Sequence, residues 1–247
     1  MTINYWMYFL ITGRFLGSML ICPLFSEGLF PRMLKMILAL LFALIVVPRF
    51  WEVPVPDNDI LCMALLAKEV LIGALLSYLF SFPLWLIENV GNIIDLQRGE
   101  QFGAVVNQLT KDPSSSISKL MFQGFMAYFV SVGGIVFFIK LVAMSFLIVA
   151  PTDFLPHLVS SDVVISAFAQ YFYWLVVLAL PVIFAMYLLE LILGLFSTFI
   201  QQLNVTVLSM PLKSILAIFI LTIYLGSLYH FVILRFVNEN MLSIFKS

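Results

Sequence analysis

Long apolar runs dominate this chain of 247 residues. A helix needs about 20 apolar residues to cross the hydrocarbon core of a bilayer, and several of the runs are longer than that. We therefore predict an all-α integral membrane protein with about six hydrophobic helical segments. The runs lie at about residues 5–25, 33–47, 60–86, 120–150, 163–200 and 205–234.

The composition places most of the surface against lipid or protein instead of water. The mean hydropathy is +1.13, and charged residues make up 10% of the chain, against roughly 25% in a typical soluble domain. The formal net charge is −1, which leaves no basic patch for nucleic acid, so we expect no nucleic-acid partner. We predict a multi-pass protein of an inner (cytoplasmic) membrane.

No linker or change of composition divides the chain, which favours a single membrane-embedded domain, 1–247. For six crossings, the nine Lys and Arg other than Arg14, Lys68 and Lys140 number six on one side and three on the other, which favours both termini in the periplasm. The run 163–200 is longer than a bilayer needs. Pro181 is therefore expected to kink one long helix there or to separate two shorter ones.

Small residues four positions apart recur in most runs and predict close helix packing, because they let two backbones approach. These sets are Gly13 and Gly17, Ala39 and Ala43, Gly73 with Ser77 and Ser81, Gly194 and Thr198, and Thr222 and Gly226.

The sequence lacks the motifs of common catalytic and metal sites. The sequence has no metal-binding His-Glu-x-x-His, phosphate-binding loop or Cys-x-x-Cys motif, so we expect no enzyme activity, no cofactor and no metal. An intramembrane enzyme is a weaker alternative, with His157 and His230 as its acid-base candidates. Cys22 and Cys62 lie in apolar segments, where buried packing is expected.

Apart from Lys35 near the start of its run and Lys213 in the polar segment 201–213, five charged residues fall within the apolar runs, where each costs about 2.5–3.5 kcal/mol at a helix centre. They are Arg14, Lys68, Glu69, Lys140 and Glu190. Lys68 and Glu69 point about 100° apart on a helix and are not expected to be each other's main partner. Arg14 is the candidate partner for Glu69, and Glu190 for Lys68. Ion pairs between helices or subunits are the favoured interpretation, and a relay in a secondary transporter or ion channel is the alternative.

A polar island, residues 88–119, holds seven of the 25 charged residues. Three glycines there permit backbone shapes that other residues resist: Gly91, Gly99 and Gly103. Asp112-Pro113 prevents a continuous helix. These features predict either a bent, re-entrant loop, in which the apolar residues 102–106 block a cavity, or an ordinary cytoplasmic connector.

A second polar segment, residues 201–213, lies between the last two apolar runs and predicts the tip of a helical hairpin. Asn204 and the neighbouring glutamine amides are suited to satisfy backbone groups at helix ends. Pro211 is expected to start the next helix, and Lys213 fits a cytoplasmic tip.

The motifs of both polar segments resemble the T subunit of the bacterial type III secretion export apparatus, SctT, and its flagellar counterpart FliR. The features that carry the resemblance are Arg14 with Pro23-Leu-Phe-Ser26 and Pro31, Lys68-Glu69-Val-Leu-Ile-Gly73, Gly91-Asn-Ile-Ile-Asp95-Leu-Gln97-Arg98-Gly99, Asp112-Pro113, and Gln202-Leu-Asn204-Val205 to Pro211-Leu-Lys213. Gln201 departs from the family, which usually has proline there. Arg98 after Asp95-Leu-Gln97 is more similar to the injectisome branch than to the flagellar one, which stays the alternative.

The resemblance implies a structural subunit of an export gate. It would join R-type and S-type subunits in an inner-membrane pore for unfolded secreted substrates, with membrane lipid around it. The family's plug loop matches about residues 99–116, with Gly99, Gln101, Phe102, Gly103, Ala104, Val105, Val106, Asn107 and Gln108 as its gating residues. The residues Arg14, Lys68, Glu69, Asp95, Arg98 and Glu190 would be structural or interface charges. The hairpin residues Gln202, Asn204, Pro211 and Lys213 would face the cytoplasm, where the switch subunit SctU (flagellar FlhB) and the ring subunit SctV (FlhA) are expected.

Overall fold

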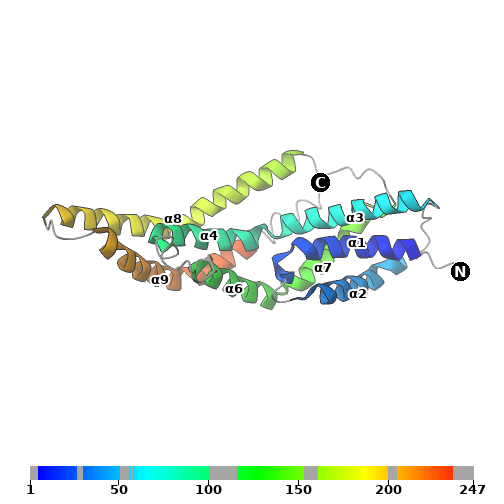
Figure 1. The fold of residues 1–247 in the computed structure, drawn as a ribbon, viewed down its shortest axis with the longest axis horizontal. Helices are drawn as coiled ribbons and strands as arrows, with labels where there is room; N and C mark the ends of the chain where they lie inside the picture. The colour runs from blue at the N-terminus through cyan, green and yellow to red at the C-terminus, as the bar shows by residue number, and fades with distance from the viewer. Residues whose placement is uncertain are drawn as a thin grey trace. The chain divides into compact units, whose positions relative to one another are not determined.

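The computed structural model describes residues 5–26, 30–50, 56, 58–100, 116–152, 161–199 and 205–235, and this part of the chain is helical throughout (Figure 1). The predicted all-α class is confirmed. The elements are α1 (Tyr5–Ile21), the short 3-10 helix η1 (Pro23–Phe25), α2 (Arg32–Phe50), α3 (Asp59–Phe80), α4 (Phe82–Arg98), α6 (Ser116–Ser131), α7 (Gly134–Ile148), α8 (Ser161–Phe199) and α9 (Val205–Val232).

Four of these helices are long and apolar enough to cross a membrane: α2, α3, α8 over Ile165–Phe199, and the segment Leu208–Arg235 that contains α9. The helices α6 and α7 follow each other across a short break and would make a fifth span if the pair counted as one. The chain is therefore a multi-pass membrane protein, as predicted.

Two of the predicted runs are broken into two helices each. The run 60–86 breaks at Ser81, which ends α3. The run 120–150 breaks before Gly133, whose φ of 93° lies in the left-handed region that favours glycine. In contrast, α8 continues through Pro181 as one helix of 39 residues. The proline is exposed, so its ring meets solvent or lipid instead of a packed neighbour.

The described chain forms two compact units. Unit 1 is Met1–Phe82 with Val130–Ala167, and unit 2 is Pro83–Phe129 with Phe168–Ser247. The single domain expected for 1–247 stays a prediction. In unit 1, α1 packs against α2 and α3, and its core contains Phe15, whose ring centroid lies 6.0 Å from those of Phe42 and Phe146.

The predicted close packing of small residues is confirmed between α1 and α3. A Cβ atom on Gly17 would overlap the Val70 carbonyl oxygen, and one on Gly73 would overlap the Arg14 carbonyl oxygen. For Gly194 and Gly226 the prediction is not met among the described residues, because a Cβ on either would meet nothing within 4 Å. Small residues bring helices together only where a second helix lies opposite them.

Unit 2 is held together by side chains that reach across helices. The Asn89 amide of α4 donates to the Tyr171 hydroxyl of α8 at 2.7 Å, and the Tyr229 hydroxyl of α9 donates to the Met121 carbonyl of α6 at 2.7 Å. A Cβ atom on Gly91 would lie 2.5 Å from the Ser118 Cα atom, so α4 and α6 are in close contact there. Gly91 thus lets α4 pack closely against α6, and its own backbone is ordinary helix.

Candidate functional site

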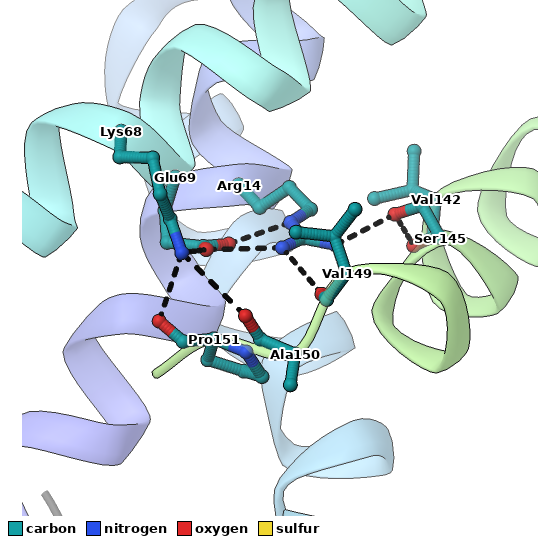
Figure 2. A network of polar contacts seen from close by, with 8 residues as sticks. All are labelled: Arg14, Lys68, Glu69, Val142, Ser145, Val149, Ala150 and Pro151. Carbon is teal, nitrogen blue, oxygen red and sulfur yellow. Dashed lines mark hydrogen bonds and ion pairs between the residues drawn. The ribbon is translucent and has the colours of Figure 1, made fainter. Parts of the chain in front are cut away.

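A buried ion pair joins α1 to α3 in unit 1 (Figure 2). The Arg14 guanidinium donates from Nε to Glu69 Oε2 at 2.6 Å and from Nη2 to Glu69 Oε1 at 3.0 Å. Both side chains are 0% exposed. Two parallel N–H to oxygen bonds give this pair a defined geometry as well as charge neutralisation. The predicted partnership of Arg14 with Glu69 is confirmed.

Lys68 completes the network from the neighbouring position on α3. Its ammonium lies 2.8 Å from Glu69 Oε1 and donates to the Pro151 carbonyl at 3.0 Å. The suggested pair of Glu190 with Lys68 is wrong, because Glu190 pairs with Lys213. Glu69 has its main partner in Arg14, as expected, but it also contacts its neighbour Lys68. The reason is the length of the lysine stem, which lets Nζ curve back to a carboxylate that starts from another face of the helix.

The end of α7 supplies the remaining acceptors of the network (Figure 2). Arg14 Nη1 donates to Ser145 Oγ at 3.0 Å, and Arg14 Nη2 also donates to the Val149 carbonyl at 3.0 Å. The Phe146 ring lies 4.0 Å from the guanidinium carbon, a cation–π contact. Carbonyls at a helix C-terminus are suitable acceptors because the helix leaves its last four unpaired. This network therefore ties α1, α3 and α7 together.

A second ion pair lies in unit 2. The Lys213 ammonium of α9 donates to Glu190 Oε2 of α8 at 2.9 Å and lies 3.4 Å from the Gln97 carbonyl of α4. The Lys213 side chain is 8% exposed and that of Glu190 is 47% exposed. Lys213 is thus a buried connector of three helices, and the prediction of a lysine at a hairpin tip is wrong. A cation at the end of α4 also complements the helix dipole.

The hairpin between α8 and α9 differs from its prediction at its second arm. The helix α9 begins at Val205, so Pro211 lies inside it instead of starting it. Pro211 is exposed. At an exposed position, the missing backbone donor and the proline ring disturb few packed neighbours. Gln202 and Asn204 lie outside the described residues.

The polar island is helical in its first part. The helix α4 continues to Arg98, so residues 88–98 do not belong to a loop as the glycines and amides had suggested. Gly99 ends the helix with a φ of 81°, and its N–H donates to the Leu96 carbonyl at 3.1 Å. This is the usual left-handed glycine at a helix C-terminus.

Asp95 connects the two ends of the island. Its Oδ2 atom accepts the backbone N–H groups of Ile117 at 3.1 Å and Ser118 at 2.9 Å, at the N-terminus of α6. Its Oδ1 atom lies 2.6 Å from Arg98 Nη2. A carboxylate is a favourable cap there because the first N–H groups of a helix have no partner within the helix. We call this arrangement of Asp95, Arg98, Ile117 and Ser118 the clasp.

One further contact strengthens the clasp. Ser118 Oγ donates to the backbone carbonyl of Glu88 at 2.8 Å. The side-chain carboxyl of Glu88 is half-buried, and the loss of hydration raises its pKa. Sequence reasoning singled out Asp95 and Arg98 but missed Ile117, Ser118 and Ser145. The pairs Asp95–Ser118 and Arg14–Ser145 are 23 and 131 positions apart, and no local motif signals such distant contacts.

The predicted gating residues Gln101, Phe102, Gly103, Ala104, Val105, Val106, Asn107 and Gln108 lie outside the described residues. Of the charges proposed for a transporter, Lys68 and Glu69 form ion pairs in unit 1, and Glu190 forms one in unit 2. Within the described part of the chain, no group of three His, Cys, Asp or Glu residues is suited to hold a metal ion. The geometry thus supports structural ion pairs.

Comparison with known proteins identifies the family. The family model described as bacterial export proteins, family 1, matches residues 5–238. The chain is 31% identical to the Yop proteins translocation protein T of Yersinia pestis, over 88% of this chain and 85% of that protein. It is 32% identical to the secretion system apparatus protein SsaT of Salmonella typhimurium, over 71% and 69%, and 26% identical to the flagellar biosynthetic protein FliR of Escherichia coli, over 83% and 79%. The chain therefore belongs to the bacterial export proteins of family 1, the SctT and FliR family that its motifs resemble.

Proposed function

We propose that this T subunit of a type III export apparatus forms part of the inner-membrane pore for unfolded secreted proteins, and that residues 99–116 plug the pore at rest. The clasp is the observation that carries the proposal. Because Asp95 binds the start of α6 while Gly99 ends α4, the described residues on either side of the segment 101–115 are held close to each other. A segment anchored at both ends is suited to move as a unit.

The injectisome branch is the favoured system. The relatives named for Yop translocation and for the secretion apparatus are 31% and 32% identical to the chain. The two flagellar relatives, from Escherichia coli and Bacillus subtilis, are 26% and 23% identical. R-type and S-type subunits are the proposed partners in the pore. The switch subunit SctU and the ring subunit SctV are proposed at the cytoplasmic face, next to the hairpin of residues 201–213.

A deletion tests the plug. Removing residues 101–107 in cells that carry the whole apparatus is expected to let small solutes leak across the inner membrane, because the obstructing segment is lost. Replacing the same seven residues with a Gly/Ser stretch of equal length is the matched control for loop length, and it too is expected to leak. Unchanged permeability in both strains, with the apparatus assembled, would contradict the assignment.

A cysteine probe tests the position of the segment. The native cysteines Cys22 and Cys62 are buried in the structure, so a cysteine introduced at Ala104 would react above a low background. We expect the Ala104→Cys thiol to be protected from a cytosolic maleimide at rest and to react during export. A thiol that reacts freely in both states would show an exposed connector instead of a plug.

A further inference from the structure

We propose that Lys140, halfway along α7, marks a docking surface for a neighbouring export subunit that presents a carboxylate from an apolar helix. Of Arg14, Lys68, Glu69, Lys140 and Glu190, the charges singled out in the sequence, four are paired inside this chain: Arg14 and Lys68 with Glu69, and Glu190 with Lys213. Lys140 is the remaining one. It is exposed, and it takes part in no ion pair with the residues that the structure describes.

The surface around Lys140 is otherwise apolar. Val136 and Met144, one turn before and after it, are 56% and 53% exposed, and Leu147 is 63% exposed. Residues three and four apart lie on one side of a helix, so these side chains form a stripe with a single cation in its middle. We call Val136, Lys140, Met144 and Leu147 the α7 face.

An ammonium at this position needs a partner. Charged side chains in membrane segments almost always face protein or a water-filled cavity and pair with one another. Lysines that reach the headgroups do so from helix ends, whereas Lys140 has more than a turn of α7 on either side. Glu69, the carboxylate of the network that reaches the end of α7, already binds both Arg14 and Lys68.

The complementary surface is therefore an apolar helix with one Asp or Glu. This inference rests on the proposed role of the chain as one subunit of an export apparatus, but not on the plug. Assembly of the complex tests the α7 face, whereas leakage of solutes tests the plug, so either proposal can fail without the other.

The test is chemical crosslinking in the isolated whole complex. Dicyclohexylcarbodiimide, which enters membranes, activates a carboxylate, and the Lys140 amine then attacks it to form an amide while the reagent leaves as its urea. We expect a crosslinked peptide that joins Lys140 to an Asp or Glu of another subunit. The Lys140→Arg complex should assemble but give no such peptide. Lys119→Arg, at the exposed start of α6, is the matched control and should leave the crosslink unchanged.

Assembly gives a second readout. Lys140→Glu is expected to lower the yield of intact complex about tenfold, because like charges then face each other. Exchanging the crosslinked acid for Lys in the same strain should restore the yield. Normal assembly of Lys140→Glu and Lys140→Met, with no crosslink to another subunit, would overturn the proposal and assign Lys140 to lipid headgroups. A crosslink to an acid of this same chain would overturn it equally.

Discussion

The Asp95 carboxylate accepts the backbone N–H of Ser118 at 2.9 Å and thereby holds the end of α4 to the start of α6. The two residues are 23 positions apart, and the segment proposed as the plug lies between them. A side chain that caps a helix from such a distance determines where that helix can begin. The clasp therefore holds together the described residues on either side of the segment 101–115.

Removing the cap is expected to loosen the first turn of α6. Loss of an N-terminal cap costs about 0.5–2 kcal/mol, so Asp95→Ala should speed hydrogen exchange at the Ile117 and Ser118 amides about tenfold, since 1.4 kcal/mol is a factor of ten. Hydrogen exchange of the isolated complex measures this. Leu96→Ala, at the next and exposed position, is the control and should leave both amides unchanged. Equal exchange in all three proteins would show that Asp95 does not stabilise α6.

The Arg14–Glu69 pair predicts a double-substitution result. Replacing Arg14 alone by Met leaves the carboxylate with Lys68 as its only charged partner, and replacing Glu69 alone leaves two cations together. Breaking a buried pair costs about 3–5 kcal/mol. The double variant Arg14→Met/Glu69→Met removes both charges and is expected to be destabilised by less than the sum of the two single variants. Thermal unfolding of the purified complex measures the stability of each variant. If the losses of the two single variants simply add in the double variant, the two residues are not coupled.

The contact between α1 and α3 predicts a sharp difference among glycines. Gly17→Ala and Gly73→Ala would place a methyl group on a carbonyl oxygen of the facing helix, and such overpacking costs about 1–3 kcal/mol. Gly194→Ala is the matched control, because its Cβ would meet nothing within 4 Å. We expect the first two variants to lower the unfolding temperature and the control to leave it unchanged or raise it. A control as harmful as Gly17→Ala would contradict the explanation.

The Lys213–Glu190 pair predicts an asymmetric effect. Glu190→Gln leaves a buried ammonium without its counter-charge, whereas Lys213→Met leaves a half-exposed carboxylate that keeps part of its hydration. Burying an unpaired charge is the costlier outcome. We therefore expect Glu190→Gln to reduce the yield and unfolding temperature of the complex more than Lys213→Met does. The reverse order would show that the buried side chain is not the one that needs its partner.

Interactions that depend on composition or on neighbouring residues were predictable from the sequence. Apolar runs longer than a bilayer core require membrane helices whatever lies beside them, so the all-α class followed directly. The Arg14–Glu69 pair was also predictable, because charges in apolar segments are few and must find each other. The left-handed φ of Gly99 agrees with the backbone freedom expected of this glycine, although the helix that it ends was not predicted.

Interactions between distant segments were decided only by the tertiary structure. Lys213 pairs with Glu190, and Asp95 caps α6, because the folded chain brings together groups that share no local pattern. The same applies to the small residues: Gly17 and Gly73 lie against a facing helix, whereas Gly194 and Gly226 do not. Sequence spacing establishes which side of a helix a residue occupies, but the partner on that side is set by the path of the rest of the chain.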